Sequence, residues 1–123
     1  MAPSGPMGFV FSDVILRGPG GSRTLRMLVD TGSTYTWVPE AIARELCALE
    51  RGVVHLRTAD NRLVDRILGE LEVEVLGRRG TRFIVFALEG EEPLLGTDTL
   101  EGLLLEVDPT HHVLKRVDVA LAL

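Results

Sequence analysis

Short apolar runs separated by glycine-rich or polar turns follow one another along the chain, and this pattern predicts a small β protein. Strands are predicted over residues 8–16 and 23–29, because apolar side chains recur in both segments. The Gly-Pro-Gly-Gly-Ser cluster at 18–22 separates them as a turn. The two strands are therefore expected to pair as a hairpin that leads into Asp30.

Residues 70–75 alternate strictly between Glu and an apolar residue. A period of two predicts a strand with one packed face and one solvated face. A partner strand is predicted over residues 81–88, after a turn at 77–80. The glutamates are expected to form surface ion pairs with nearby arginines, namely Arg78, Arg79 and Arg82.

One helix is predicted over residues 39–49. Pro39 suits a first helical turn, and Ile42 and Leu46 are spaced to share one face. Cys47 is expected to be a small buried side chain and not a reactive thiol, since neither a histidine nor a basic pair accompanies it.

Two more hairpins are predicted in the second half of the chain. Residues 53–71 contain two apolar runs around a polar tip formed by Thr58, Ala59, Asp60, Asn61 and Arg62. Asp and Asn favour turns, so the tip is expected to project from the protein. Residues 103–119 repeat this arrangement around the Asp-Pro-Thr turn at 108–110.

The segment 28–39 contains the most informative motif. Two apolar residues run directly into Asp30, Thr31 and Gly32 follow, and apolar residues then resume. Burying a carboxylate without partners is costly. Gly32 permits a turn whose backbone N–H groups can hold the carboxylate at the edge of the core. The residues alone also fit an ordinary Asp-Gly turn without chemistry.

The run Asp30-Thr31-Gly32-Ser33 resembles the active-site loop of aspartic peptidases, and its continuation to Trp37-Val38-Pro39 is similar to the pepsin version. Pepsin-like enzymes carry two such loops in a much longer chain, whereas this chain of 123 residues has one. The resemblance is therefore to the retropepsin-like, homodimeric aspartic peptidases. It implies an all-β, mainly antiparallel, closed acid-protease fold with one or two short helices. The tip at 58–62 would be the flap that covers the substrate.

A second element supports the resemblance. Pro93-Leu94-Leu95-Gly96 is similar to the apolar-apolar-Gly element that follows the flap in retropepsins. Retroviral enzymes place an Arg directly after this Gly, but Thr97 stands there in this chain, so their interface ion pair cannot be carried over. Asp98, with Glu101 three residues later, is expected to cap a short helix.

The resemblance also implies a site. Asp30, Thr31 and Gly32 would be catalytic, with Ser33 and Gly96 in supporting roles. Activity would require a homodimer, since each copy supplies one Asp30, and the substrate would be a polypeptide. Thr31 would hydrogen-bond across the two-fold axis, Gly32 would offer its backbone to the substrate, and the Ser33 hydroxyl would donate to Asp30. No cofactor is implied.

Composition limits the other possibilities. The length fits one domain over residues 8–123 after a flexible arm at 1–7. The net charge of −5 argues against nucleic acid as a partner. Neither a membrane-spanning run nor a secretion signal is recognisable, so we expect no membrane partner and a cytoplasmic location. The three histidines lack metal-ligand spacing, so no metal is expected.

Two other functions fit parts of the pattern. The chain could be a catalytically inactive retropepsin-like module for dimerisation or peptide binding, although the intact Asp-Thr-Gly argues against that. Asp30 could serve phosphoryl transfer, but neither the Lys of that motif nor a Gly-rich phosphate loop is recognisable. The apolar segment 117–123 either supplies dimer contacts or packs on its own chain.

Overall fold

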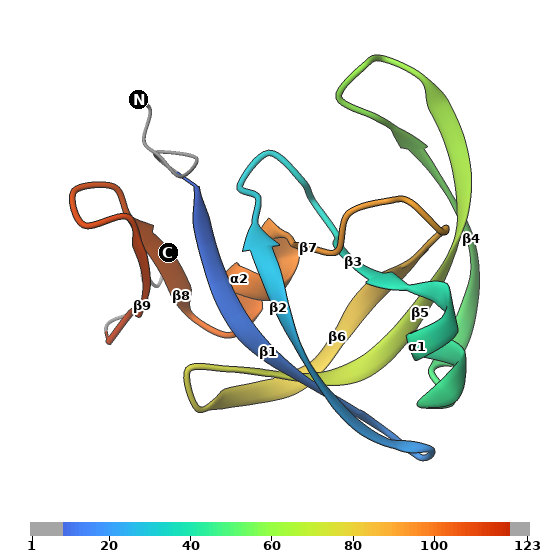
Figure 1. Ribbon diagram of the computed structural model, residues 1–123, viewed down its shortest axis with the longest axis horizontal. Coiled ribbons are helices and arrows are strands. Elements are labelled where there is room, and N and C mark those ends of the chain that lie inside the picture. The colour runs from blue at the N-terminus through green and yellow to red at the C-terminus, as the bar shows by residue number, and fades with distance from the viewer. Residues whose placement is uncertain (1–8, 119–123) are drawn as a thin grey trace, which may run out of the picture.

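The computed structural model describes residues 9–118, which form nine strands and two short helices (Figure 1). The predicted arm at 1–7 and residues 119–123 of the apolar C-terminal segment lie outside the described residues. The strands are β1 (Val10–Gly18), β2 (Gly21–Val29), β3 (Thr36–Pro39), β4 (Leu49–Arg57), β5 (Leu63–Val75), β6 (Arg78–Ala87), β7 (Leu94–Leu95), β8 (Leu105–Asp108) and β9 (Val113–Arg116). The helices are α1 (Glu40–Glu45) and α2 (Thr97–Gly102).

Seven strands form one sheet in the order β1-β2-β7-β3-β6-β5-β4. An additional pairing of β1 with β5 closes six of them into a barrel, and β4 stays outside as the partner of β5. Most ladders are antiparallel, while β2 with β7 and β3 with β6 are parallel. The predicted closed, mainly antiparallel fold with short helices is confirmed.

The predicted hairpins are also observed. β1 pairs with β2 from Val10 opposite Val29 to Gly18 opposite Gly21, so the hairpin delivers the chain directly to Asp30. β4 pairs with β5 in the hairpin that was expected to form the flap. β8 and β9 form a separate two-stranded sheet.

The strict alternation in β5 places its apolar side chains in the barrel core. Leu71, Val73 and Val75 are buried, while the glutamates between them are only partly covered. The core also contains inward-facing residues of the neighbouring strands, for example Leu16 of β1 and Phe86 of β6.

The expected partners of these glutamates were wrong. Glu72 and Glu74 both accept hydrogen bonds from Arg17, at 3.0 and 2.7 Å. The reason is the closure of the barrel, because the β1–β5 ladder places Arg17 directly opposite Glu72. Glu70 pairs instead with Arg51 of β4, at 3.1 Å.

The predicted helix over residues 39–49 is shorter than expected, and the expectation that Cys47 is buried was wrong. The helix ends at Glu45, and Leu46, the residue after it, is fully buried in the core. Cys47 adopts a left-handed backbone conformation with φ of 57° and is exposed. This conformation turns the chain into β4, so the side chain after Leu46 points away from the core.

The exposure of Cys47 predicts that its thiol reacts in the folded protein. A chromogenic disulfide reagent should label about one thiol per chain in native buffer, as completely as it does in denaturant. Labelling that requires unfolding would contradict the observed position of Cys47.

Candidate active site

Asp30 lies in the loop between β2 and β3, and this loop lies at one end of the barrel (Figure 1). The residue is half-buried, and its Oδ1 accepts a hydrogen bond from the Gly32 N–H at 2.9 Å. The Ser33 N–H donates to the Asp30 carbonyl at 3.1 Å and closes the turn. A Cβ on Gly32 would approach Oδ1 to 3.2 Å, so a larger residue at this position would press on the Asp30 carboxylate.

Two neighbours of Asp30 complete the loop. Thr31 is exposed. The expected hydrogen bond from Ser33 to Asp30 was wrong: the Ser33 hydroxyl donates to the Tyr35 carbonyl at 2.8 Å. Ser33 therefore stabilises the shape of the loop, and among residues 9–118 the backbone N–H of Gly32 is the group that orients the Asp30 carboxylate.

Backbone hydrogen bonds between the Asp30 loop and the β7–α2 segment hold the loop in place. The bonds join the Asp30 N–H to the Leu95 carbonyl at 2.9 Å, the Thr97 N–H to the Ser33 carbonyl at 2.8 Å, and the Asp98 N–H to the Thr34 carbonyl at 2.9 Å. Because backbone groups make these contacts, the position of the loop depends little on the side chains at its surface.

Gly96 lies at the centre of this contact. A Cβ at this buried position would collide with the Tyr35 carbonyl oxygen, so only glycine allows the approach. The Gly96 N–H donates to the hydroxyl of Thr36 at 3.1 Å, and that hydroxyl shares a second hydrogen bond with Thr99 at 2.7 Å. Thr36 and Thr99 are fully buried, so their hydroxyls satisfy groups that water cannot reach.

The expected capping role of Asp98 was wrong. Helix α2 begins after Gly96 without a side-chain cap. The Asp98 carboxylate instead accepts a hydrogen bond from Arg82 of β6 at 2.9 Å, and the same nitrogen also donates to the Asp98 carbonyl at 3.0 Å. Arg82 therefore anchors the start of α2 to the barrel.

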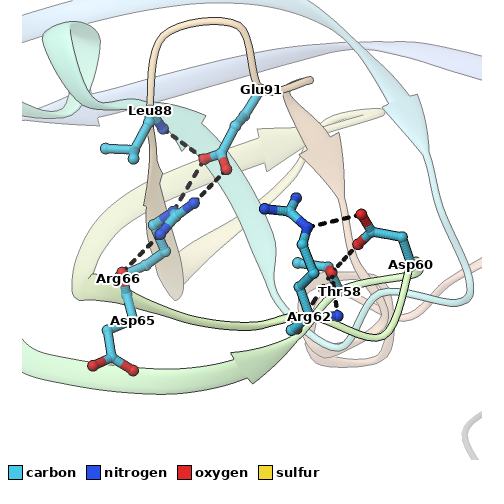
Figure 2. Close-up of polar contacts among 7 residues, drawn as sticks. All are labelled: Thr58, Asp60, Arg62, Asp65, Arg66, Leu88 and Glu91. Carbon is cyan, nitrogen blue, oxygen red and sulfur yellow. Dashed lines mark hydrogen bonds and ion pairs between the residues drawn. The ribbon is translucent and has the colours of Figure 1, made fainter.

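The tip of the β4–β5 hairpin is held by its own residues (Figure 2). The Thr58 N–H donates to the Arg62 carbonyl at 2.8 Å. Asn61 adopts a left-handed conformation with φ of 66°, which asparagine tolerates. The Thr58 hydroxyl and the Arg62 guanidinium both donate to Asp60. The hydrogen bond from Thr58 has the larger effect and that from Arg62 the next, and together they hold the pKa of Asp60 below its ordinary value.

A cavity of about 530 Å³ lies between the Asp30 loop and the hairpin. Its lining includes Asp30, Gly32, Ser33, Trp37, Arg57, Thr58, Ala59, Glu91, Glu92 and Leu94. Of the five predicted flap residues, Thr58 and Ala59 thus face the cavity, whereas Asp60, Asn61 and Arg62 do not line it. A larger cavity of about 720 Å³, near Cys47 and Glu70, does not include Asp30.

Several cavity residues were missed by the sequence analysis. Arg57, Glu91 and Glu92 carry no motif, and they meet only because the hairpin and the loop after β6 fold toward Asp30. Trp37 also forms part of the cavity wall. Its place in the Trp-Val-Pro continuation of the motif was the available signal.

Among residues 9–118, no group of three His, Cys, Asp or Glu side chains is arranged to hold a metal ion. Neither α1 nor α2, the helices of this part of the chain, has the length and apolar character needed to cross a membrane.

The comparisons with known proteins bear directly on this geometry. Residues 20–102 match the family described as "gag-polyprotein putative aspartyl protease". The chain belongs to this aspartyl protease family. The matched residues run from the β1–β2 turn to the end of α2 and so contain both the Asp30 loop and Gly96. A search of curated proteins found no match.

Among solved structures, this aspartyl protease family member is similar to a foamy viral protease–reverse transcriptase that was solved in complex with double-stranded DNA. The TM-score is 0.51 with 19% sequence identity over 73% of this chain, a likeness that shows the fold alone. The match spans only 15% of the length of the foamy viral protein.

The buried hydroxyl of Thr36 predicts a measurable cost of removing it. Thr36→Val keeps the shape of the side chain but leaves the Gly96 N–H without its acceptor, so the free energy of unfolding should fall by about 1–3 kcal/mol. Urea unfolding followed by Trp37 fluorescence measures this change.

Thr24→Val is the matched control, because Thr24 is an exposed strand residue of β2. Its effect should stay within about 0.5 kcal/mol. Equal destabilisation by the two substitutions would show that the Thr36 hydroxyl has no special role in holding the loop.

Proposed function

We propose that this protein is an aspartic endopeptidase that hydrolyses peptide bonds as a homodimer. The observation that carries the proposal is the position of Asp30: the Gly32 N–H orients its carboxylate, and it faces a cavity with flap residues Thr58 and Ala59 on the opposite side. Membership of the aspartyl protease family supports the same chemistry. A cytoplasmic location stays a prediction.

The second carboxylate is proposed to be Asp30 of another copy. The cavity also contains Glu91 and Glu92, but Arg66 neutralises Glu91, and neither glutamate lies in an Asp-Thr-Gly loop. A two-fold axis beside the loop would bring the two Asp30 side chains together through an isologous interface. The exposed position of Thr31 is compatible with a hydrogen bond across that axis.

Two carboxylates at hydrogen-bond distance share one proton, since two like charges so close cannot both ionise; aspartic peptidases are the standard example of this coupling. The ionised Asp30 removes a proton from a water molecule, whose oxygen attacks the peptide carbonyl carbon. The protonated Asp30 donates its proton to the carbonyl oxygen. The gem-diol then collapses: the Asp30 that is now ionised takes a proton from one of its hydroxyls, the other Asp30 gives the amine nitrogen the proton it took from water, and the C–N bond breaks. The protein forms no covalent intermediate and needs no cofactor.

The surrounding residues bind and shield the substrate in this mechanism. The Gly32 N–H already donates to Asp30, so we propose that the carbonyl oxygen of Gly32 accepts a hydrogen bond from the peptide backbone. The hairpin tip would close over the peptide, exclude water, and offer backbone hydrogen bonds from Ala59, because the Thr58 N–H is already donated to the Arg62 carbonyl.

Removal of the Asp30 charge should abolish cleavage. In Asp30→Asn the amide cannot act as a general base, so the rate of cleavage of unfolded casein at mildly acidic pH should fall about 10²–10⁴-fold. Gel electrophoresis and mass spectrometry of the fragments measure this rate.

Asp13→Asn serves as the control, because Asp13 is an exposed aspartate of β1 outside the Asp30 cavity. It should cleave at the wild-type rate. An Asp30→Asn variant that keeps full activity would exclude the peptidase proposal, and a folded wild-type protein that dimerises without cleaving would favour the inactive binding module.

The shared site also predicts that specific activity depends on the total protein concentration. Specific activity should fall on dilution below the dimer dissociation constant, because a single chain carries half of the acid pair. An excess of Asp30→Asn chains should inhibit wild-type protein by forming mixed dimers, whereas the same excess of albumin should not. Constant specific activity from a protein that sediments as a monomer would contradict the shared site.

A further inference from the structure

The arm of the flap, residues 53–67, has few attachments to the rest of the protein. β5 pairs with β6 only from Leu68 onward, so residues 63–67 of β5 pair with β4 alone. Ile67 packs against the core at the base of the arm. Within residues 9–118, the one side-chain hydrogen-bonded contact from the arm to another element joins Arg66 to Glu91.

This contact is a two-pronged ion pair (Figure 2). Arg66 Nε donates to Glu91 Oε1 at 3.1 Å and Arg66 Nη2 donates to Oε2 at 2.5 Å. The Arg66 side chain is only 12% exposed, so water competes weakly for it. Glu91 Oε1 also accepts the Leu88 N–H at 2.7 Å, which fixes the carboxylate to its own turn.

The pair connects opposite walls of the Asp30 cavity. Glu91 lines the cavity from the loop after β6, and Arg57 and Thr58 line it from the flap arm that carries Arg66. A change in the separation of Arg66 and Glu91 would therefore change the height of the flap above Asp30.

We propose that Arg66 and Glu91 are positioning residues that hold the flap arm at a defined height over Asp30 and thereby determine how tightly a polypeptide substrate binds. This inference rests on the proposed peptidase function. The hydrogen bonds from Arg66 hold the pKa of Glu91 below its ordinary value, so the carboxylate stays ionised in the mildly acidic range proposed for catalysis.

The test begins with Glu91→Gln, which keeps the shape of the side chain and removes its charge. KM for a peptide taken from a cleavage site in unfolded casein should rise about tenfold, while kcat changes by less than about threefold, because the Asp30 loop stays in place. Glu89→Gln is the matched control: Glu89 is exposed on the same turn and does not line the Asp30 cavity. Its kinetic constants should equal those of the wild type.

A double-mutant cycle tests whether the two residues act as a pair. Arg66→Gln should raise KM to a similar extent, and the Arg66→Gln/Glu91→Gln variant should raise it no further. Arg66→Lys retains the charge and should recover part of the affinity. Additive effects on KM, or an unchanged KM in Glu91→Gln, would overturn the proposal.

Hydrogen exchange separates this inference from the peptidase proposal. Backbone amides of residues 53–57 and 63–67 should exchange faster in Glu91→Gln, while those of residues 70–75, which lie in the β5–β6 ladder, should keep the wild-type rate. If the wild type cleaves no polypeptide, the peptidase function fails, but this measurement still applies to the arm. Unchanged exchange in residues 53–57 and 63–67 would overturn the positioning role.

Discussion

The contact between the Asp30 loop and the β7–α2 segment is the constraint on which the candidate site depends. Buried backbone groups must find partners, and here the loop and the segment satisfy one another directly. Gly96 makes the approach sterically possible, and the Thr36 hydroxyl supplies the acceptor that its N–H requires. The acid is therefore positioned by buried, rigid elements, which is the arrangement that precise catalytic geometry needs.

The opposite wall of the cavity is built in another way. The tip of the flap is held by hydrogen bonds among its own exposed residues, and the arm below it is a two-stranded ribbon. Two-stranded ribbons are marginally stable without further packing. A rigid floor and a lightly attached roof would suit the proposed peptidase, which must admit a polypeptide and then close over it. Within residues 9–118, the Arg66–Glu91 pair is the side-chain hydrogen-bonded link between the flap arm and the rest of the cavity.

Asp30 and Glu91, two of the carboxylates that line the cavity, differ in their hydrogen-bond partners. At the floor, Asp30 accepts a hydrogen bond from the Gly32 N–H and faces the cavity. In the loop after β6, Glu91 is neutralised by Arg66 and accepts a hydrogen bond from the Leu88 N–H of its own turn. Asp30 thus has the position proposed for catalysis with a second copy, whereas Glu91 is bound by contacts within its own chain, although both line the same cavity.

The sequence by itself determined the strands of the hairpins and the Asp-Thr-Gly loop, because alternation, turn residues and a charged residue at the end of a strand are local signals. It did not predict the short strands β3 and β7. It did not determine which side chains meet across the barrel. Arg17, and none of the expected arginines, pairs with Glu72 of β5. Asp98 pairs with Arg82 and does not cap the helix, and Arg66 pairs with Glu91, which lies 25 residues away in the sequence. Only closure of the sheet brings such residues together, since long side chains pair with whichever opposite charge the tertiary structure places within reach.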